Sequence, residues 1–164
     1  MGEGGPEDTV TALLAAQVRA RPEAPAVIYQ DRVVTFAELE GMGRRAATAL
    51  TELGVGAGDR VALWLPNAPA YLALWLGCAR LGAIAVAVNT RFRSAEVGDI
   101  VARSGARVLA LWPGFRDIDF LGILAEVDAA ALAGLETLIL YGEDGAEHAA
   151  PGQVAHCRRV AFPE

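Results

Sequence analysis

The stretch "RVALWLPNAPAYLALWLGCARLGAIAVAV", residues 60–88, decides the fold of this chain. "RVALWL" is a short apolar run typical of a buried strand, and "AIAVAV" is a second one. Between them, Asn67 is in position to cap a helix that continues to Leu81. Prolines, Asn67 and Arg80 break the apolar run into pieces shorter than the ~20 residues that a membrane-spanning helix needs. We therefore predict a strand, a helix and a second strand in the core of a soluble domain.

The same alternation continues after residue 88. Ser94 is expected to cap a helix to about Ser104, "RVLALW" is a third strand, a helical stretch covers 117–132, and "LETLILY" is a fourth strand. Continuous aliphatic strands separated by helices indicate parallel strands that are covered on both faces. The predicted fold class is α/β, a mostly parallel sheet with helices on both faces.

An N-terminal helix and a β-hairpin are predicted to precede this sheet. The helix covers 10–20, and the hairpin turns at Gln30–Asp31 within "AVIYQDRVVTF". A capping box formed by Thr35 and Glu38 then begins an amphipathic helix at Phe36. Residues 1–8 are predicted to be a disordered tail, 9–141 the α/β subdomain, and 142–164 a linker or surface segment, because the periodic pattern ends there.

Three glycines in "ELGVGAGDR", Gly54, Gly56 and Gly58, raise the question of a phosphate-binding loop. Such a loop follows a strand and opens a helix, so that backbone N–H groups converge on the anion. Here the glycines follow a helix and precede a strand. We interpret the segment as a helix-to-strand turn in which Gly54 ends the helix in a left-handed conformation.

Composition excludes several classes of function. The formal net charge is −6, and all 14 basic residues are arginine, so the chain offers neither a basic surface for nucleic acid nor a catalytic lysine. Neither of its two serines lies in a nucleophile elbow. His148, His156 and Cys157 fit no common zinc spacing, so no metal site is predicted. Two cysteines are too few for a disulfide framework and indicate a reducing compartment.

Ligands of an open parallel sheet collect beyond the carboxyl ends of its strands. The loops expected there are "PNAPAY", "NTRFRS" and "PGFRDI", which carry Asn67, Asn89, Thr90, Arg91, Arg93 and Arg116. Arg91 and Arg93, beside a helix N-terminus, either clamp an anion or are solvated loop charges. The sequence alone leaves both interpretations open.

Several motifs together resemble the N-terminal part of the AMP-forming acyl-CoA synthetases, of the adenylate-forming superfamily. They are, in order, "P-x-x-PAV", "T-F-x-E-L", "L-G-V-x-x-G-D-R-V-A", "L-P-N" and "G-A-x-x-V-x-V-N-T-R-F". The resemblance runs from about Val10 to Leu111 and more loosely to Tyr141. The "NTRF" form is similar to fatty-acyl-CoA ligases and also to aryl and other short-acid ligases, so it does not fix the acyl chain.

The resemblance implies a two-step ligase reaction. A fatty or other carboxylic acid and ATP, with Mg²⁺, give an acyl-adenylate, and CoA then displaces AMP to form a thioester. Asn89, Thr90, Arg91 and Arg116 match positions near the path of CoA. The resemblance assigns no catalytic residue and no metal ligand to this chain.

The chain departs from the family pattern, because the Ser/Thr/Gly-rich phosphate loop and the catalytic lysine are expected downstream of Glu164. We therefore expect a fragment that is inactive alone and binds none of these ligands tightly. The expected location is the cytoplasm, with possible peripheral membrane contact, and exposed apolar surface makes an oligomer possible. Two alternatives remain open: a free-standing flavodoxin-like binding module, which "PNAPAY" argues against because it lacks serine and threonine, and a non-catalytic interaction domain.

Overall fold

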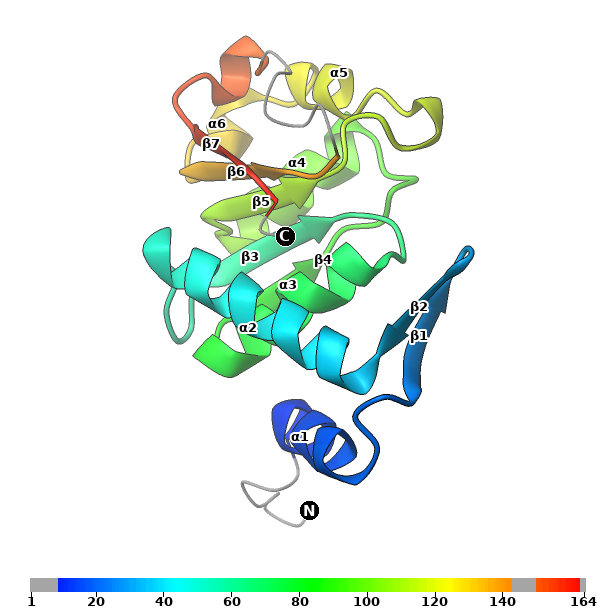
Figure 1. Ribbon diagram of the computed structural model, residues 1–164. Helices are drawn as coiled ribbons and strands as arrows, with labels where there is room; N and C mark the ends of the chain where they lie inside the picture. The colour runs from blue at the N-terminus through cyan, green and yellow to red at the C-terminus, as the bar shows by residue number, and fades with distance from the viewer. Residues whose placement is uncertain (1–8, 143–149, 163–164) are drawn as a thin grey trace, which may run out of the picture.

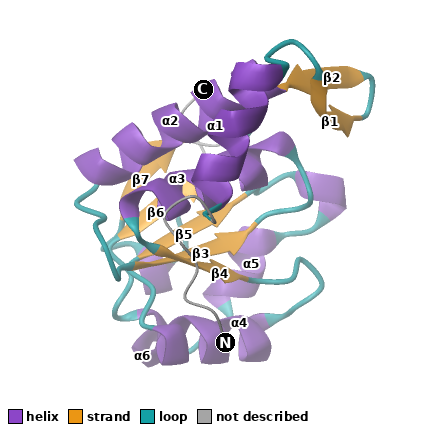
Figure 2. Ribbon diagram, turned by 90° about the horizontal axis from the view of Figure 1, so that it is seen from below, coloured by secondary structure: helices purple, strands orange, loops and turns teal. Residues whose placement is uncertain are grey.

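The computed structural model describes residues 9–142 and 150–162, so the predicted tail over 1–8 lies outside the described residues. Three layers make up the fold, a central sheet between two sets of helices (Figures 1 and 2). In chain order the elements are α1 (Val10–Ala20), β1 (Pro25–Tyr29), β2 (Arg32–Thr35), α2 (Phe36–Glu52), β3 (Arg60–Trp64), α3 (Pro69–Leu81), β4 (Ile84–Ala87), α4 (Ser94–Ser104), β5 (Val108–Leu111), the 3₁₀ turn η2 (Phe115–Asp117), α5 (Phe120–Ala125), α6 (Ala129–Leu132), β6 (Thr137–Leu140), the 3₁₀ turn η4 (Gly152–Val154) and β7 (Arg158–Ala161).

The sheet runs in the order β4-β3-β5-β6-β7, and all of its neighbouring strands are parallel. Figure 2 shows α1, α2 and α3 on one face and α4, α5 and α6 on the other. The predicted fold class is therefore confirmed, including the separate hairpin of β1 and β2. Because the chain moves from β3 outward to β4 and then returns to β5, the strand order reverses between β3 and β5, which is where such sheets bind ligands.

Side chains of the interior strand β3 alternate between two cores. Val61 and Leu63 pack with α2 and α3, whereas Ala62 and Trp64 pack with α4, α5 and α6. All four are fully buried, so the strand is apolar on both faces, as the sequence pattern indicated.

Helices α2 and α3 approach each other closely at Gly77. A Cβ atom placed on Gly77 would lie 3.0 Å from the Cβ of Ala46 and 3.0 Å from the backbone nitrogen of Ala47. The absence of a side chain there sets the distance between the two helices. Because α3 follows the loop after β3, this contact also fixes the position of that loop.

The glycine turn at 54–58 joins α2 to β3. Gly54 has a φ of 78°, its N–H donates to Thr51 O and the Val55 N–H donates to Leu50 O. This pair of bonds satisfies carbonyls in the last turn of the helix in the Schellman arrangement. The predicted role of Gly54 as a left-handed helix end is confirmed.

Arg107 ties this turn to the amino-terminal edge of the sheet. Its guanidinium makes two hydrogen bonds to Glu136, of 2.9 and 2.7 Å, and one of 3.2 Å to Asp59. The Gly56 N–H, with Arg107, holds the pKa of Asp59 below its ordinary value, and Arg107 lowers the pKa of Glu136. These ionic contacts lie at the edge opposite to the carboxyl ends of the strands.

Two helix boundaries differ from the prediction. The N-cap of α3 is Ala68 rather than Asn67, because Pro69, which has no N–H and a fixed φ, suits the first helical position. The N-cap of α4 is Arg93 rather than Ser94, because Glu96, three residues later, accepts the Arg93 N–H at 3.0 Å.

The helical stretch predicted over 117–132 is divided into η2, α5 and α6. Asp119 accepts the Gly122 N–H and Asp128 accepts the Ala130 N–H, so each aspartate begins a helix of its own. Asp side chains compete in this way with a continuous helix.

The segment predicted over 142–164 as a linker or surface segment instead contributes to the sheet. Its described residues form η4 and β7, and β7 pairs in parallel with β6. Val154 and Cys157 are buried. The prediction was wrong because β7 is an edge strand with two exposed arginines, which hides the apolar pattern of a buried strand.

Two further observations concern side chains and surface. Cys78 is a free, buried cysteine, and desolvation raises the pKa of its thiol to about 12. Among the described residues, no helix is long and apolar enough to cross a membrane.

Candidate functional site

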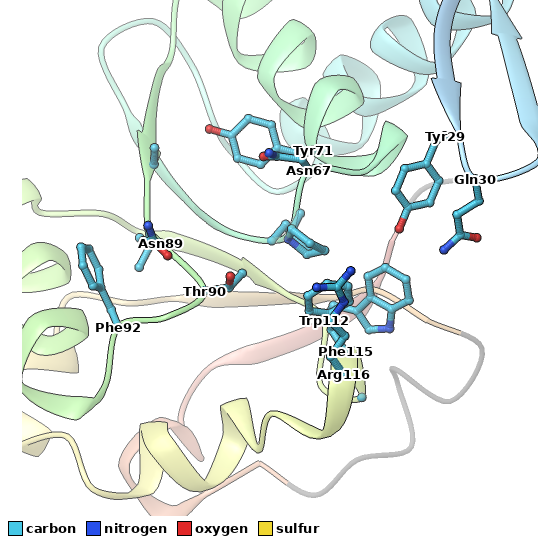
Figure 3. Close-up of a pocket in the computed structure, with 15 residues that line it drawn as sticks. Tyr29, Gln30, Asn67, Tyr71, Asn89, Thr90, Phe92, Trp112, Phe115 and Arg116 are labelled. Carbon is cyan, nitrogen blue, oxygen red and sulfur yellow. The ribbon is translucent and has the colours of Figure 1, made fainter.

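A cavity of about 860 Å³ opens at the carboxyl ends of β3, β4 and β5, where the strand order reverses. Figure 3 shows the side chains that surround it. The lining residues are Tyr29, Gln30, Leu65, Pro66, Asn67, Tyr71, Ala87, Val88, Asn89, Thr90, Phe92, Trp112, Gly114, Phe115 and Arg116. The three loops that the sequence placed at this edge therefore meet around one cavity.

Asn89 and Thr90 line the cavity from the loop that follows β4. The Asn89 carbonyl accepts a hydrogen bond of 3.1 Å from the indole N–H of Trp64, which is fully buried. The Asn89 side-chain oxygen accepts the backbone N–H of Arg91 at 2.9 Å. These two bonds anchor the loop to the core and turn the chain immediately after the strand.

Arg116 lines the cavity from the loop that follows β5. Its backbone is left-handed, with φ 49° and ψ 44°, and its guanidinium carbon lies 5.3 Å from the centre of the Phe115 ring. Arg116 makes no ion pair with another described residue. It is also the only charged side chain in the described lining, so the cavity presents one available guanidinium to an anion.

Arg91 and Arg93 occupy different positions from Arg116. The Arg91 side chain is exposed and is not part of the cavity lining. The Arg93 guanidinium donates to the carbonyls of Arg91 and Phe92, at 3.0 and 3.1 Å, and so holds its own loop. The structure thus brings together Asn89, Thr90 and Arg116 but forms no clamp from Arg91 and Arg93.

Two lining residues come from outside the sheet and were missed from the sequence. Tyr29, at the end of β1, and Gln30, in the turn of the β1–β2 hairpin, reach the cavity (Figure 3). The hairpin itself was predicted, but nothing in its local sequence indicates which loop of the sheet it faces. Four aromatic side chains also line the cavity: Tyr71, Phe92, Trp112 and Phe115.

The described lining carries no carboxylate, histidine or cysteine. Elsewhere in the part of the chain that the structure describes, no group of three or more such side chains could hold a metal ion. What the lining offers is aromatic faces, neutral amide and hydroxyl groups and one cation. This set suits binding of a planar, anionic ligand rather than acid–base or nucleophilic chemistry by these residues.

Comparison with known proteins identifies the family. The sequence model of the AMP-binding enzymes matches residues 14–157, which is most of the chain. The chain belongs to the AMP-binding enzyme family. The match extends beyond Tyr141, where the resemblance in the sequence ended, and includes η4.

Two of the curated relatives that the chain matches are CoA ligases. The long-chain-fatty-acid–CoA ligase FadD13 of Mycobacterium tuberculosis is 40% identical over 94 residues, 57% of this chain and 19% of the relative. A 3-[(3aS,4S,7aS)-7a-methyl-1,5-dioxo-octahydro-1H-inden-4-yl]propanoyl:CoA ligase of the same species is 40% identical over 133 residues, 80% of this chain and 25% of the relative. The chain therefore spans about a fifth to a quarter of the length of these family members.

A solved structure supports the same assignment. The anthranilate CoA ligase AuaEII, crystallised with anthranoyl-AMP, matches 89% of this chain and 27% of its own with a TM-score of 0.76 and 26% identity. The α/β arrangement described above is thus that of the N-terminal region of adenylate-forming AMP-binding enzymes.

Proposed function

We propose that the protein is an ATP-dependent, AMP-forming carboxylic acid–CoA ligase, in which this chain supplies the wall that CoA contacts. The proposal rests on one observation: Asn89, Thr90 and Arg116 converge around one cavity, at the place where the strand order of the sheet reverses. A guanidinium that forms no ion pair with another described residue suits a phosphate of CoA, and the neutral loop groups suit the amides of its pantetheine arm. Arg91, exposed beside them, is proposed to contact CoA at the rim.

A fatty acid is the proposed acyl substrate, with other carboxylic acids as the wider class. FadD13 supports the fatty acid, whereas the propanoyl:CoA ligase and the anthranilate ligase are named for other acids. ATP would enter with Mg²⁺, and we propose no ligand to that ion within this chain. A cytoplasmic location is proposed because the reaction would consume the ATP and CoA found there.

The CoA proposal is tested by titrating CoA into the ¹⁵N-labelled chain and following backbone amide chemical shifts. We expect saturable shifts at Asn89, Thr90 and Arg116, with millimolar affinity, and none at Arg103, an exposed arginine of α4 outside the cavity lining. Absence of shifts in the cavity loops at saturating CoA would contradict the proposal.

The chain by itself is proposed to be catalytically inactive. It contains no lysine that could stabilise the charge of an adenylyl transfer, and the described residues of the cavity lining contribute a single cation. We expect no exchange of labelled pyrophosphate into ATP above a protein-free control, with any of a panel of fatty and aromatic acids. Steady exchange proportional to protein concentration would show that the chain is active.

A further inference from the structure

We propose that the turn of the β1–β2 hairpin is a specificity element of this cavity, in which the Gln30 amide recognises the adenine base of CoA. The inference rests on the proposed function, because it assumes that CoA occupies the cavity. It assigns a role to a hairpin that lies outside the parallel sheet and carries none of the loop residues discussed so far.

The position of the hairpin turn is the first observation. Tyr29 and Gln30 line the cavity together with Trp112 and Arg116, which come from the loop after β5 (Figure 3). Residues more than 80 positions apart in the sequence therefore face the same space. A ligand whose phosphate binds Arg116 would therefore occupy the same cavity that the hairpin turn lines.

The backbone of Gln30 is the second observation. Tyr29 pairs with Arg32, which leaves a two-residue turn, and its first residue, Gln30, has a φ of 53°. Asp31, the second turn residue, is not among the described residues with positive φ, so positive φ is confined to the first position, as in a type II′ turn, where glycine is favoured. Only two other described non-glycine residues have positive φ, namely Arg116 and Asp117, and Arg116 lines this same cavity. Residues held in this conformation concentrate at ligand sites, and here turn geometry does not account for a glutamine.

The chemistry of the side chains is the third observation. A glutamine amide carries a donor and an acceptor side by side, which matches the adjacent N6 amino group and N7 acceptor of adenine. The Gln30 amide has no hydrogen-bond partner among the described residues, so it is available to a ligand. Tyr29 and Trp112 provide aromatic faces on which a base can stack.

The variant Gln30→Gly separates this role from folding. It removes the side-chain amide, and glycine adopts a positive φ without strain. We therefore expect a melting temperature equal to or higher than that of the wild type. In the NMR titration we expect its affinity for CoA to be about tenfold lower, as for the loss of paired hydrogen bonds. Asp31→Asn, in the second turn residue and outside the lining of this cavity, is the matched control, with an affinity within about twofold of the wild type.

Modified ligands locate the contact on the base. The analogue 1,N⁶-etheno-CoA lacks the adenine amino donor, so we expect wild type and Gln30→Gly to bind it equally. ATP carries the same adenine without the pantetheine arm, and we expect it to shift Gln30 only at higher concentration than CoA. A Gln30 that responds more strongly to ATP than to CoA would assign the element to ATP and overturn the inference.

The outcomes distinguish the two proposals. If CoA shifts Asn89, Thr90 and Arg116 but Gln30→Gly binds CoA like the wild type, the hairpin inference is wrong and the proposed function stands. If CoA shifts none of the cavity residues, both are wrong. A tenfold loss for CoA in Gln30→Gly, together with equal binding of the etheno analogue, supports the inference.

Discussion

Replacing Gly77 by alanine is expected to destabilise the folded chain by about 2 kcal/mol, the typical cost of inserting a methyl group into a packed core. The new Cβ would lie 3.0 Å from the Ala47 backbone nitrogen and 3.1 Å from the Ala46 backbone carbon of α2. Backbone atoms of a helix cannot rotate away as a long side chain can, so α2 and α3 would have to separate. The free energy of unfolding, measured in urea, reports this loss.

A glycine on the partner helix provides the matched control. A Cβ on Gly41 of α2 would approach only the end of the flexible Arg45 side chain, at 3.3 Å. Gly41→Ala should therefore gain helix propensity, up to about 1 kcal/mol, without a clash. The two alanine variants are expected to shift stability in opposite directions. A stabilised Gly77→Ala would mean that the helices do not pack as closely as described.

Arg116→Ala, in a whole ligase that contains this chain, is expected to raise the KM for CoA about ten- to a hundredfold. A hydrogen bond to a charged group contributes about 1.5–3 kcal/mol, which corresponds to this range if KM tracks binding. Acyl-adenylate formation needs no CoA, so pyrophosphate exchange into ATP should change little. Steady-state kinetics with varied CoA, alongside the exchange assay, measures both quantities.

Two other arginines make this test specific. Arg103→Ala removes an exposed guanidinium that pairs with Asp99 within α4, and its KM for CoA should equal that of the wild type. Arg91→Ala examines the proposed contact at the rim and should have a smaller effect than Arg116→Ala, because Arg91 lies outside the cavity lining. An unchanged KM in Arg116→Ala would leave this residue as a solvated loop charge.

Local patterns in the sequence were sufficient to predict much of the fold. The buried run of β3 is apolar on both faces, the Thr35–Glu38 capping box forms, and Gly54 ends α2 at positive φ. Each of these features depends on residues close together in the chain. By contrast, β7 is largely exposed and pairs only with β6 in the described sheet, so its residues carry no buried-strand pattern.

The part of the candidate site that follows from the parallel strands was predictable. Because the carboxyl ends of parallel strands lie at the same edge of the sheet, the sequence placed Asn89, Thr90 and Arg116 near one another. The direction of a side chain within a loop is set by contacts that sequence does not show, and for this reason Arg91 was not distinguished from Arg116. The approach of Tyr29 and Gln30 depends on how the hairpin packs on the sheet, which is a tertiary property.

The position of Trp112 at the cavity also gives the protein an optical reporter of whether the cavity is occupied. Trp112 packs edge-on against Tyr141, with ring centres 4.6 Å apart, and lines the cavity, whereas Trp64 is fully buried and Trp75 lies on α3 outside the cavity lining. With Trp75 replaced by phenylalanine, Trp112 would be the one tryptophan within reach of a quencher in solution, because Trp64 is fully buried. Quenching of tryptophan fluorescence by iodide would then show whether solvent or a ligand fills the space beside Trp112, without any attached dye.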